Sequence, residues 1–154
     1  MTDAQAKQMQ LFNTKIIPAT EDALWSLPLE LPDFDKIRVL IFSSPFQPGS
    51  AEEATLKKIM AACKLQESDF AVIQMQADEK ISWQLLSGAG APKSIILFGI
   101  LPAQLGINAL FVLNAANSFL DCTFIPSFGL SQIEMDKELK RSLWENALKP
   151  HFLQ

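Results

Sequence analysis

Polar side chains that could do chemistry follow the predicted strands of the chain. Ligands of parallel α/β sheets collect outside the carboxyl ends of the strands, which places the candidate cleft in residues 43–49, 74–78, 99–102 and 126–132. None of its candidate lining residues is a carboxylate or a histidine, the groups that general-base chemistry normally uses. These residues are Ser43, Ser44, Phe46, Gln74, Gln76, Phe128, Gly129 and Ser131.

The remaining reactive side chains form no recognisable constellation. His151 is the only histidine, and its place near the end of the chain predicts a surface or tail role rather than catalysis. Cys63 and Cys122 lie far apart without a partnered spacing, which favours neither a disulfide framework nor a zinc site. We expect both cysteines to behave as small buried hydrophobes. No metal ion and no other cofactor is therefore expected.

Two short motifs are better explained by local structure than by chemistry. Asp78-Glu79 is the one acidic pair near a strand end, and we expect it to cap the N-terminus of a helix. Gly88-Ala89-Gly90-Ala91 precedes a strand instead of leading from a strand into a helix. It therefore lacks the geometry of Rossmann and P-loop phosphate sites, and we expect a turn.

Predicted strands and helices alternate along the chain. The apolar runs predict strands at 36–42, 70–75 and 94–98, the end of a fourth core strand at 123–125, and a small extra strand at 110–113. Helices are predicted from a capping box at Ser50 and Glu53 to about residue 64, and at 78–86, 101–105 and 136–148. This order predicts a three-layer α/β/α fold with a mostly parallel, four-stranded central sheet.

Length and composition predict one domain. The 154 residues, of which 49% are apolar, suffice for a single core. We expect residues 1–35 to form a helix and a leader packed on the domain, and residues 36–154 to form the globular unit. The net charge of -4 argues against a surface dominated by phosphate contacts. Residues 1–10 lack an apolar signal region, and the longest apolar stretch is interrupted, so a cytoplasmic location without a membrane is expected.

The C-terminal part of the chain carries a more specific motif. Phe124-Ile125-Pro126-Ser127-Phe128-Gly129-Leu130-Ser131 leads into Glu138-Leu139-Lys140-Arg141 and then Trp144-Glu145. This pattern resembles the C-terminal motif of the uracil-DNA glycosylase superfamily, in which His-Pro-Ser follows an aromatic residue and the next helix contains Glu-Leu-Lys-Arg and Trp-Glu. Residues 39–42, 56–65 and 92–99 match further elements in order. The resemblance covers roughly residues 36 to 148 and implies a uracil-DNA-glycosylase-like fold.

The same resemblance implies a degenerate, catalytically inactive member. The catalytic histidine of the family falls on Gly129, and Ser43-Ser44-Pro45 stands where active members carry the residue that orients the attacking water. Only Gln74 or Gln76 could replace the asparagine that reads the base. Each such electrostatic element typically supplies ~10²-fold or more in rate. We therefore expect no glycosylase activity and no enzyme.

A second likeness points to protein binding. At Trp25-Ser26-Leu27 and Leu143-Trp144 the chain is similar to the psi-subunit family of bacterial DNA polymerase III, a catalytically silent relative that shares the fold. The likeness implies a protein interaction module with a partner in the replication or repair machinery. Apart from this likeness, exposed apolar residues at 100–102 and 110–112 would form a surface for a partner or for a homo-oligomer, although each of them is also explained as core.

Two alternatives stay open at the level of the sequence. The chain would be a divergent DNA glycosylase or a nucleotide-processing enzyme that uses the polar side chains of the candidate cleft. Alternatively, it would bind single-stranded nucleic acid by stacking bases on Phe46 and Phe128, with Lys93 or Lys137 contacting phosphates.

Overall fold

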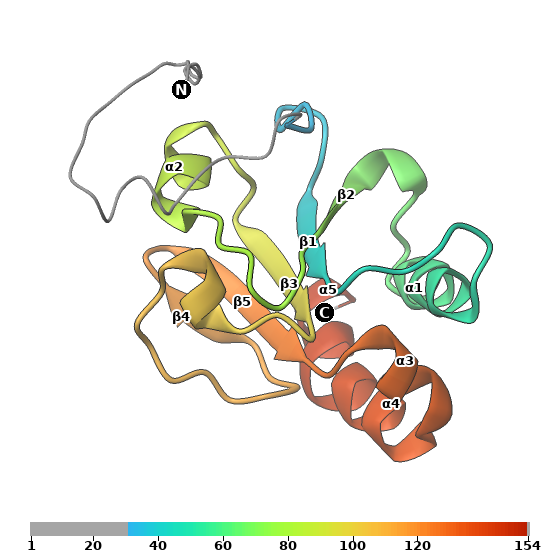
Figure 1. Ribbon diagram of the computed structural model, residues 1–154. Helices are drawn as coiled ribbons and strands as arrows, with labels where there is room; N and C mark the ends of the chain where they lie inside the picture. The colour runs from blue at the N-terminus through green and yellow to red at the C-terminus, as the bar shows by residue number, and fades with distance from the viewer. Residues whose placement is uncertain (1–30, 154) are drawn as a thin grey trace.

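The computed structural model describes residues 31–153 (Figure 1). The helix and most of the leader that the sequence predicts for residues 1–35 lie outside the described residues. Within the described part of that leader, Phe34 is buried in a core cluster with Leu40 and Trp83.

A five-stranded sheet forms the middle layer. Its order is β2-β1-β3-β5-β4, in which β4 is antiparallel to β5 and every other pair is parallel. The prediction of a mostly parallel sheet is confirmed, whereas the predicted number of four strands is wrong. The strands are β1 (Val39–Ser43), β2 (Phe70–Gln74), β3 (Ser94–Phe98), β4 (Asn117–Phe119) and β5 (Cys122–Ser127).

The additional strand is β4, which forms a tight hairpin with β5. The sequence does not predict this hairpin. β4 is joined to β5 by Leu120 and Asp121, whose φ angles are 51° and 64°. Two-residue turns with positive φ at both positions are normally built from Asn and Gly. The Leu-Asp pair gives no such signal, and the extra strand predicted at 110–113 is a loop instead.

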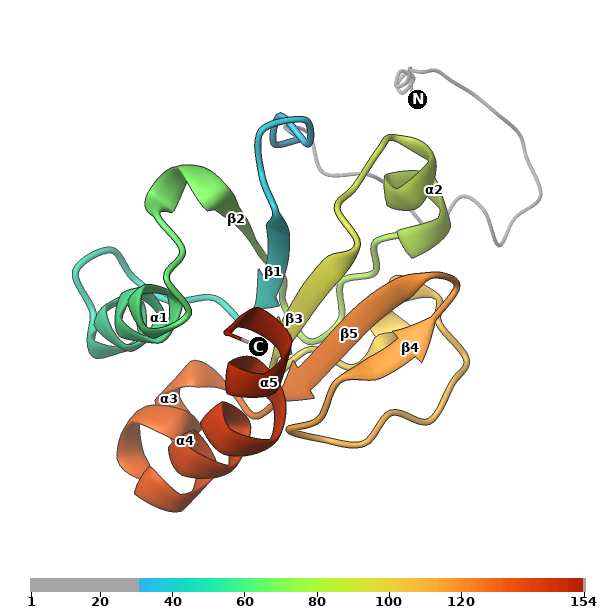
Figure 2. The same cartoon turned by 180° about the vertical axis from the view of Figure 1, so that it is seen from behind.

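Helices cover both faces of the sheet, which gives the predicted three-layer α/β/α arrangement (Figures 1 and 2). One face is covered by α1 (Ala51–Ala62), α3 (Leu130–Met135), α4 (Lys137–Leu143), the π-helical turn η4 (Trp144–Leu148) and α5 (Lys149–Phe152). The other face is covered by α2 (Trp83–Gly88) and the 3-10 turn η3 (Pro102–Leu105). A further 3-10 turn, η2 (Glu67–Asp69), leads into β2.

The core follows from the apolar runs of the two central strands. The side chains of β1 and of Ile95–Phe98 in β3 are 1% exposed or less. Alternate side chains point to opposite faces of a strand, so Ile41 and Ile96 join the cluster under α1 whereas Leu40 and Ile95 join the cluster under α2. Strands buried on both faces are typical of parallel sheets between helical layers.

The start of α1 confirms the predicted capping residue. The Ser50 hydroxyl accepts a hydrogen bond from the Glu53 N–H at 3.3 Å. The Glu53 carboxylate accepts from the Gly49 N–H at 2.8 Å, one residue before the position expected for a capping box. Leu56 and Met60 are buried on the inner face of the helix.

The helix predicted at 78–86 begins later, at Trp83, and Asp78-Glu79 does not cap it. Ser82 is the N-cap, and its hydroxyl accepts from the Leu85 N–H at 3.2 Å. The Gln104 side chain holds the preceding segment out of the helix, because its amide donates to the carbonyls of Gln76 and Glu79 at 3.0 and 3.1 Å.

The C-terminal helical segment is also divided. The helix predicted at 136–148 begins with the cap at Asp136, whose carboxylate accepts from the N–H groups of Glu138 and Leu139. After Leu143 the segment widens into η4 and then continues as α5. Pro150 has no N–H to donate to the carbonyl four residues earlier, so regular α-helical bonding cannot run through this point.

The place of His151 in the sequence predicts a surface or tail role. In the structure, however, the side chain is half-buried and lies against the start of β3. Its Nε2 atom lies 2.9 Å from the Ser94 hydroxyl, and its ring packs edge-on against Phe152 at a centroid distance of 4.7 Å. Burial lowers the pKa of His151 below its ordinary value. The contact joins α5 to the first residue of β3.

We expect the burial of His151 to make stability depend on pH. Because the pKa of His151 is lower in the folded state, the unfolded chain takes up the proton first as pH falls below about 6.5. The stabilisation is therefore complete above that pH and is lost as pH falls through the folded-state pKa. Urea unfolding at about pH 7.5 and about pH 5.5 should show a larger loss for the wild type than for His151→Gln, which cannot titrate. Equal losses would contradict the assignment.

Candidate functional site

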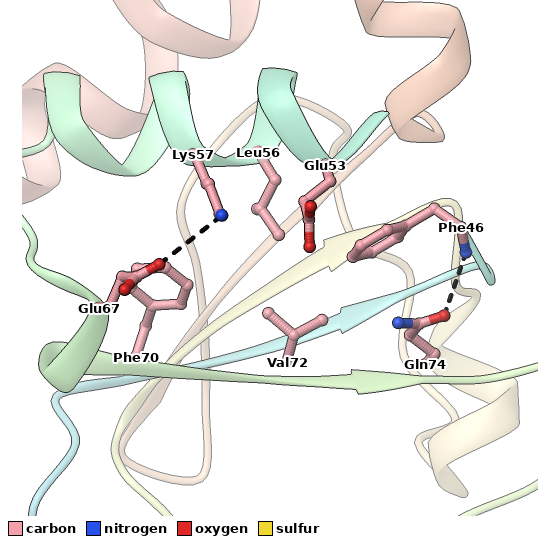
Figure 3. A pocket seen from close by; sticks show the side chains of 8 residues that line it. All are labelled: Phe46, Glu53, Leu56, Lys57, Glu67, Phe70, Val72 and Gln74. Carbon is pink, nitrogen blue, oxygen red and sulfur yellow. Dashed lines mark hydrogen bonds and ion pairs between the residues drawn. The ribbon is translucent and has the colours of Figure 1, made fainter. Parts of the chain in front are cut away.

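The residues predicted to form one cleft are divided between two cavities. Phe46 and Gln74 line a cavity of about 310 Å³ between α1 and β2 (Figure 3). Phe128 and Gly129 line a second cavity of about 370 Å³ beside the ends of β3 and β5. No described residue lines both cavities.

The other predicted cleft residues line neither cavity. Ser43 is fully buried at the end of β1, and its hydroxyl donates to the Ser44 carbonyl at 2.8 Å. Gln76 and Ser131 are exposed. Ser44 lies close to the residues that follow β3 and β5. A Cβ placed on Gly99 would lie 3.6 Å from the Ser44 Oγ, and one placed on Gly129 would lie 3.8 Å from it.

The ends of β3 and β5 meet through a close backbone contact. Gly99 has a φ of 74°, and a Cβ placed on it would lie 3.1 Å from the Gly129 Cα and 3.3 Å from the Gly129 nitrogen. The Gly99 N–H donates to the Ser127 carbonyl at 3.1 Å. Position 99 therefore requires glycine both for its backbone conformation and for the space.

Gly129, where the resemblance to the uracil-DNA glycosylases would place a histidine, offers little chemistry. Its N–H donates to the Gln132 side-chain oxygen at 3.2 Å. This hydrogen bond engages the one donor that a glycine could present to a developing negative charge. Its φ of -61° is ordinary, and a Cβ would make only normal contacts of 3.6 and 3.8 Å. The packing around this residue therefore does not require glycine.

The cavity beside Gly129 is apolar and has no titratable lining. Among the described residues that form it, the polar side chains belong to Ser127 and Gln132. Neither group serves as a general acid or base near neutral pH. In residues 31–153 no group of three or more His, Cys, Asp and Glu side chains is arranged to hold a metal ion.

Neither cysteine provides a nucleophile. Both thiols are free and buried, as predicted. Burial raises the pKa of Cys63 to about 12 and raises the pKa of Cys122 above its ordinary value. The reactive species of cysteine is the thiolate, which is therefore disfavoured at both positions.

The cavity beside Gly129 is bordered by a loop that sequence reasoning did not recognise as fixed. The Asn114 N–H donates to the Pro126 carbonyl at 2.8 Å, and its side-chain oxygen accepts from the Ser127 hydroxyl at 2.6 Å. The Asn117 side chain accepts from the Val112 N–H at 2.9 Å and donates to the Val112 carbonyl at 3.0 Å. Two asparagines therefore attach residues 112–117 to β5 by several hydrogen bonds.

The same loop exposes large apolar side chains. Phe111 points inward and stacks on Phe124 at a centroid distance of 5.3 Å. The neighbouring side chains of residues 110, 112 and 113 are exposed, as is Leu101, which lies in the segment between β3 and η3. We call these four side chains the apolar loop surface. Its members are Leu101, Leu110, Val112 and Leu113, which are 66%, 102%, 65% and 50% exposed.

The sequence around this surface is almost free of charge, a signal that agrees with a partner surface. From Ser94 to Ile133 the only charged residue is Asp121. Depletion of charge distinguishes the core of a protein interface from ordinary surface. The sequence prediction of exposed apolar residues at 100–102 and 110–112 is confirmed for Leu101, Leu110 and Val112, whereas Ile100 is buried.

The structure separates three of the four residues proposed to bind a single strand, namely Phe46, Phe128 and Lys93. Phe128 follows the carboxyl end of β5, whereas Lys93 precedes β3, which is parallel to β5. Lys93 therefore lies at the other end of the strands, where its carbonyl accepts a hydrogen bond from the Thr123 N–H at 2.7 Å. Phe46 lines the other cavity, so these three residues do not form one binding track.

Comparisons of the chain with models of protein families, with curated proteins and with solved structures found no match. Within residues 31–153 no helix has the length and apolar character needed to cross a bilayer.

The contact between the two glycines predicts a difference between two alanine variants. Gly99→Ala should lower the free energy of unfolding by about 1–3 kcal/mol, because position 99 combines positive φ with a 3.1 Å contact. Gly129→Ala should change it by less than about 0.5 kcal/mol, because its φ and contacts are ordinary. Urea denaturation of both variants measures the two changes. Similar losses in both variants would contradict this account of the contact.

Proposed function

We propose that the chain is a non-catalytic, uracil-DNA-glycosylase-like domain that acts as a protein interaction module in DNA replication or repair. The observation that carries the proposal is the apolar loop surface. It is exposed, free of charge and attached to the fold by Asn114 and Asn117.

The hydrogen bonds of the polar groups at the carboxyl ends of the strands support the non-catalytic part of the proposal. Release of a base needs a positioned water and a group that stabilises the departing anion. The Ser43 hydroxyl is buried and donates to a neighbouring carbonyl, and the Gly129 N–H donates to Gln132. Hydroxyl and amide groups already engaged in this way supply neither function.

The apolar loop surface has the energetics of a binding site. Full burial of a Leu or Val side chain contributes about 1.5–3 kcal/mol. A flexible loop would lose much of this gain on ordering. Here the loop is already fixed by hydrogen bonds from Asn117 to Val112 and from Asn114 to β5. A protein partner with a complementary apolar surface would therefore bind without first ordering residues 110–113.

The first test is excision of uracil from labelled single- and double-stranded oligonucleotides. We expect no base release, because the described residues that line the cavity beside Gly129 include no general base. An active uracil-DNA glycosylase on the same substrates is the positive control. Release that exceeds the rate without protein, and that the variant Ser44→Ala abolishes, would overturn the non-catalytic part of the proposal.

The second test locates the partner surface by photo-crosslinking in cells of the organism that makes this protein. A benzoylphenylalanine residue is placed at Leu110 or, as a matched control, at Leu85, which is 49% exposed on α2. We expect a discrete crosslinked product from position 110 and none from position 85. The product should disappear when Val112→Lys places a charge beside it. The same products from both positions, or none from position 110, would contradict the proposed surface.

A further inference from the structure

Residues 107–116 form a strap along one side of the cavity beside Gly129. This strap leads from η3 to β4, lines the cavity with residues 109–111 and 113, and carries three of the four members of the apolar loop surface. Within the described part of the chain, residues 108–113 make no backbone–backbone hydrogen bond. Segments held by few such bonds open more easily than the strands that support them. The position of the strap therefore depends on other contacts.

The side chain of Asn114 joins the strap to two other parts of the fold. Its Oδ1 atom accepts a hydrogen bond from the Ser127 hydroxyl of β5 at 2.6 Å. Its Nδ2 group donates to the Ser142 hydroxyl of α4 at 3.4 Å. One side chain therefore connects the strap both to the sheet and to the helical layer.

The backbone of Asn114 lies beside β5 beyond the reach of β4. Pairing with β4 covers β5 from Cys122 to Phe124. Pro126 is the next residue of β5 that faces this side of the sheet, and proline has no N–H with which to continue a strand ladder. Its carbonyl accepts instead from the Asn114 N–H at 2.8 Å. Among the described residues, this is the single backbone–backbone hydrogen bond from the strap to β5.

Position 114 makes two demands that asparagine meets together. Its φ of 55° lies in the left-handed region, in which asparagine is enriched among the non-glycine residues. Asn114 is 6% exposed and Ser127 is 4% exposed, and buried amides and hydroxyls need partners within the protein. Alanine would meet neither demand, and glycine would meet only the first.

The second asparagine of this region, Asn117, makes contacts of shorter range. Its side chain bonds to the Val112 N–H and to the carbonyls of Val112 and Ala115, which lie five residues away or fewer. Its bond to the Phe124 carbonyl at 3.3 Å lies within the β4–β5 hairpin. The side-chain bonds of Asn114 span 13 and 28 residues. Asn117 therefore shapes the turn before β4, whereas Asn114 fixes the strap to distant parts of the fold.

From these contacts we propose that the side chain of Asn114 is a conformational latch, which holds the strap on β5 and α4 and thereby sets the position of the apolar loop surface. Release of the latch would move the wall that residues 109–111 and 113 contribute to the cavity beside Gly129. That a partner meets this surface rests on the function proposed above, whereas the latch itself is independent of it.

The experiment measures how strongly the N–H of residue 114 is protected against amide hydrogen exchange in the full chain. This N–H is bonded to the Pro126 carbonyl, and it exchanges when the strap lifts from β5. The variants are Asn114→Ala, Ser127→Ala and the two combined. Asn146→Ala is the matched control, because Asn146 is exposed and donates to the same Ser142 hydroxyl at 3.3 Å.

We expect Asn114→Ala and Ser127→Ala each to lower the protection factor of this N–H at least about fivefold, because each leaves one partner of a buried hydrogen bond unpaired. The combined variant should lose no more protection than Asn114→Ala alone, since both changes remove the same bond. Asn146→Ala should keep the protection of the wild type. Unchanged protection in Ser127→Ala, or losses that multiply in the combined variant, would overturn the proposal.

A glycine variant separates the side chain of residue 114 from its backbone conformation. Asn114→Gly keeps the positive φ without strain but removes both side-chain bonds, and it replaces Asn114→Ala if that variant does not fold. We expect it to lose protection at least about fivefold as well. Wild-type protection in Asn114→Gly would assign the role to the backbone alone and overturn the latch. Exchange is measured without a partner, so its outcome is independent of the crosslinking from position 110.

Discussion

Burial of β1 and β3 on both faces is the constraint on which the rest of this structure depends. Each strand consists of consecutive apolar residues, and these need a covering layer above and below the sheet as well as a hydrogen-bonded neighbour on each side. α1, α3 and α4 cover one face, α2 covers the other, and β2 and β5 complete the pairing. Because helices cover both faces, the described part of the sheet is itself accessible at the strand ends and at its two outer strands.

At the carboxyl end of the sheet, several polar groups of the described residues are engaged in packing and hydrogen bonds within the chain. Gly99 brings the end of β3 within contact distance of Gly129, and the nearby Ser43 hydroxyl and Gly129 N–H are engaged inside the chain. The ordinary contacts around Gly129 would admit a side chain. The packing around position 129 therefore does not require glycine. The described residues that line the neighbouring cavity include no titratable side chain.

The parts that the sequence predicts are those determined by local pattern. Strand β3 and the inner face of α1 follow from apolar periodicity and from the Ser50 cap. The parts it does not predict depend on distant contacts or unusual turns. The start of α2 depends on Gln104, which lies far along the chain, and the β4 hairpin depends on a Leu-Asp turn. The single predicted cleft is divided because Gln74 points toward α1 whereas Gly129 borders the cavity at β3 and β5.

The apolar loop surface combines exposed side chains with an ordered backbone. Asn114 is bonded to Ser127 of β5, and Asn117 is bonded to Val112. β5 pairs with β3, and the side chains of β3 from Ile95 to Phe98 are fully buried. Close packing of this kind keeps a protein interior rigid. The proposed partner would therefore meet apolar side chains whose supporting backbone is already in place.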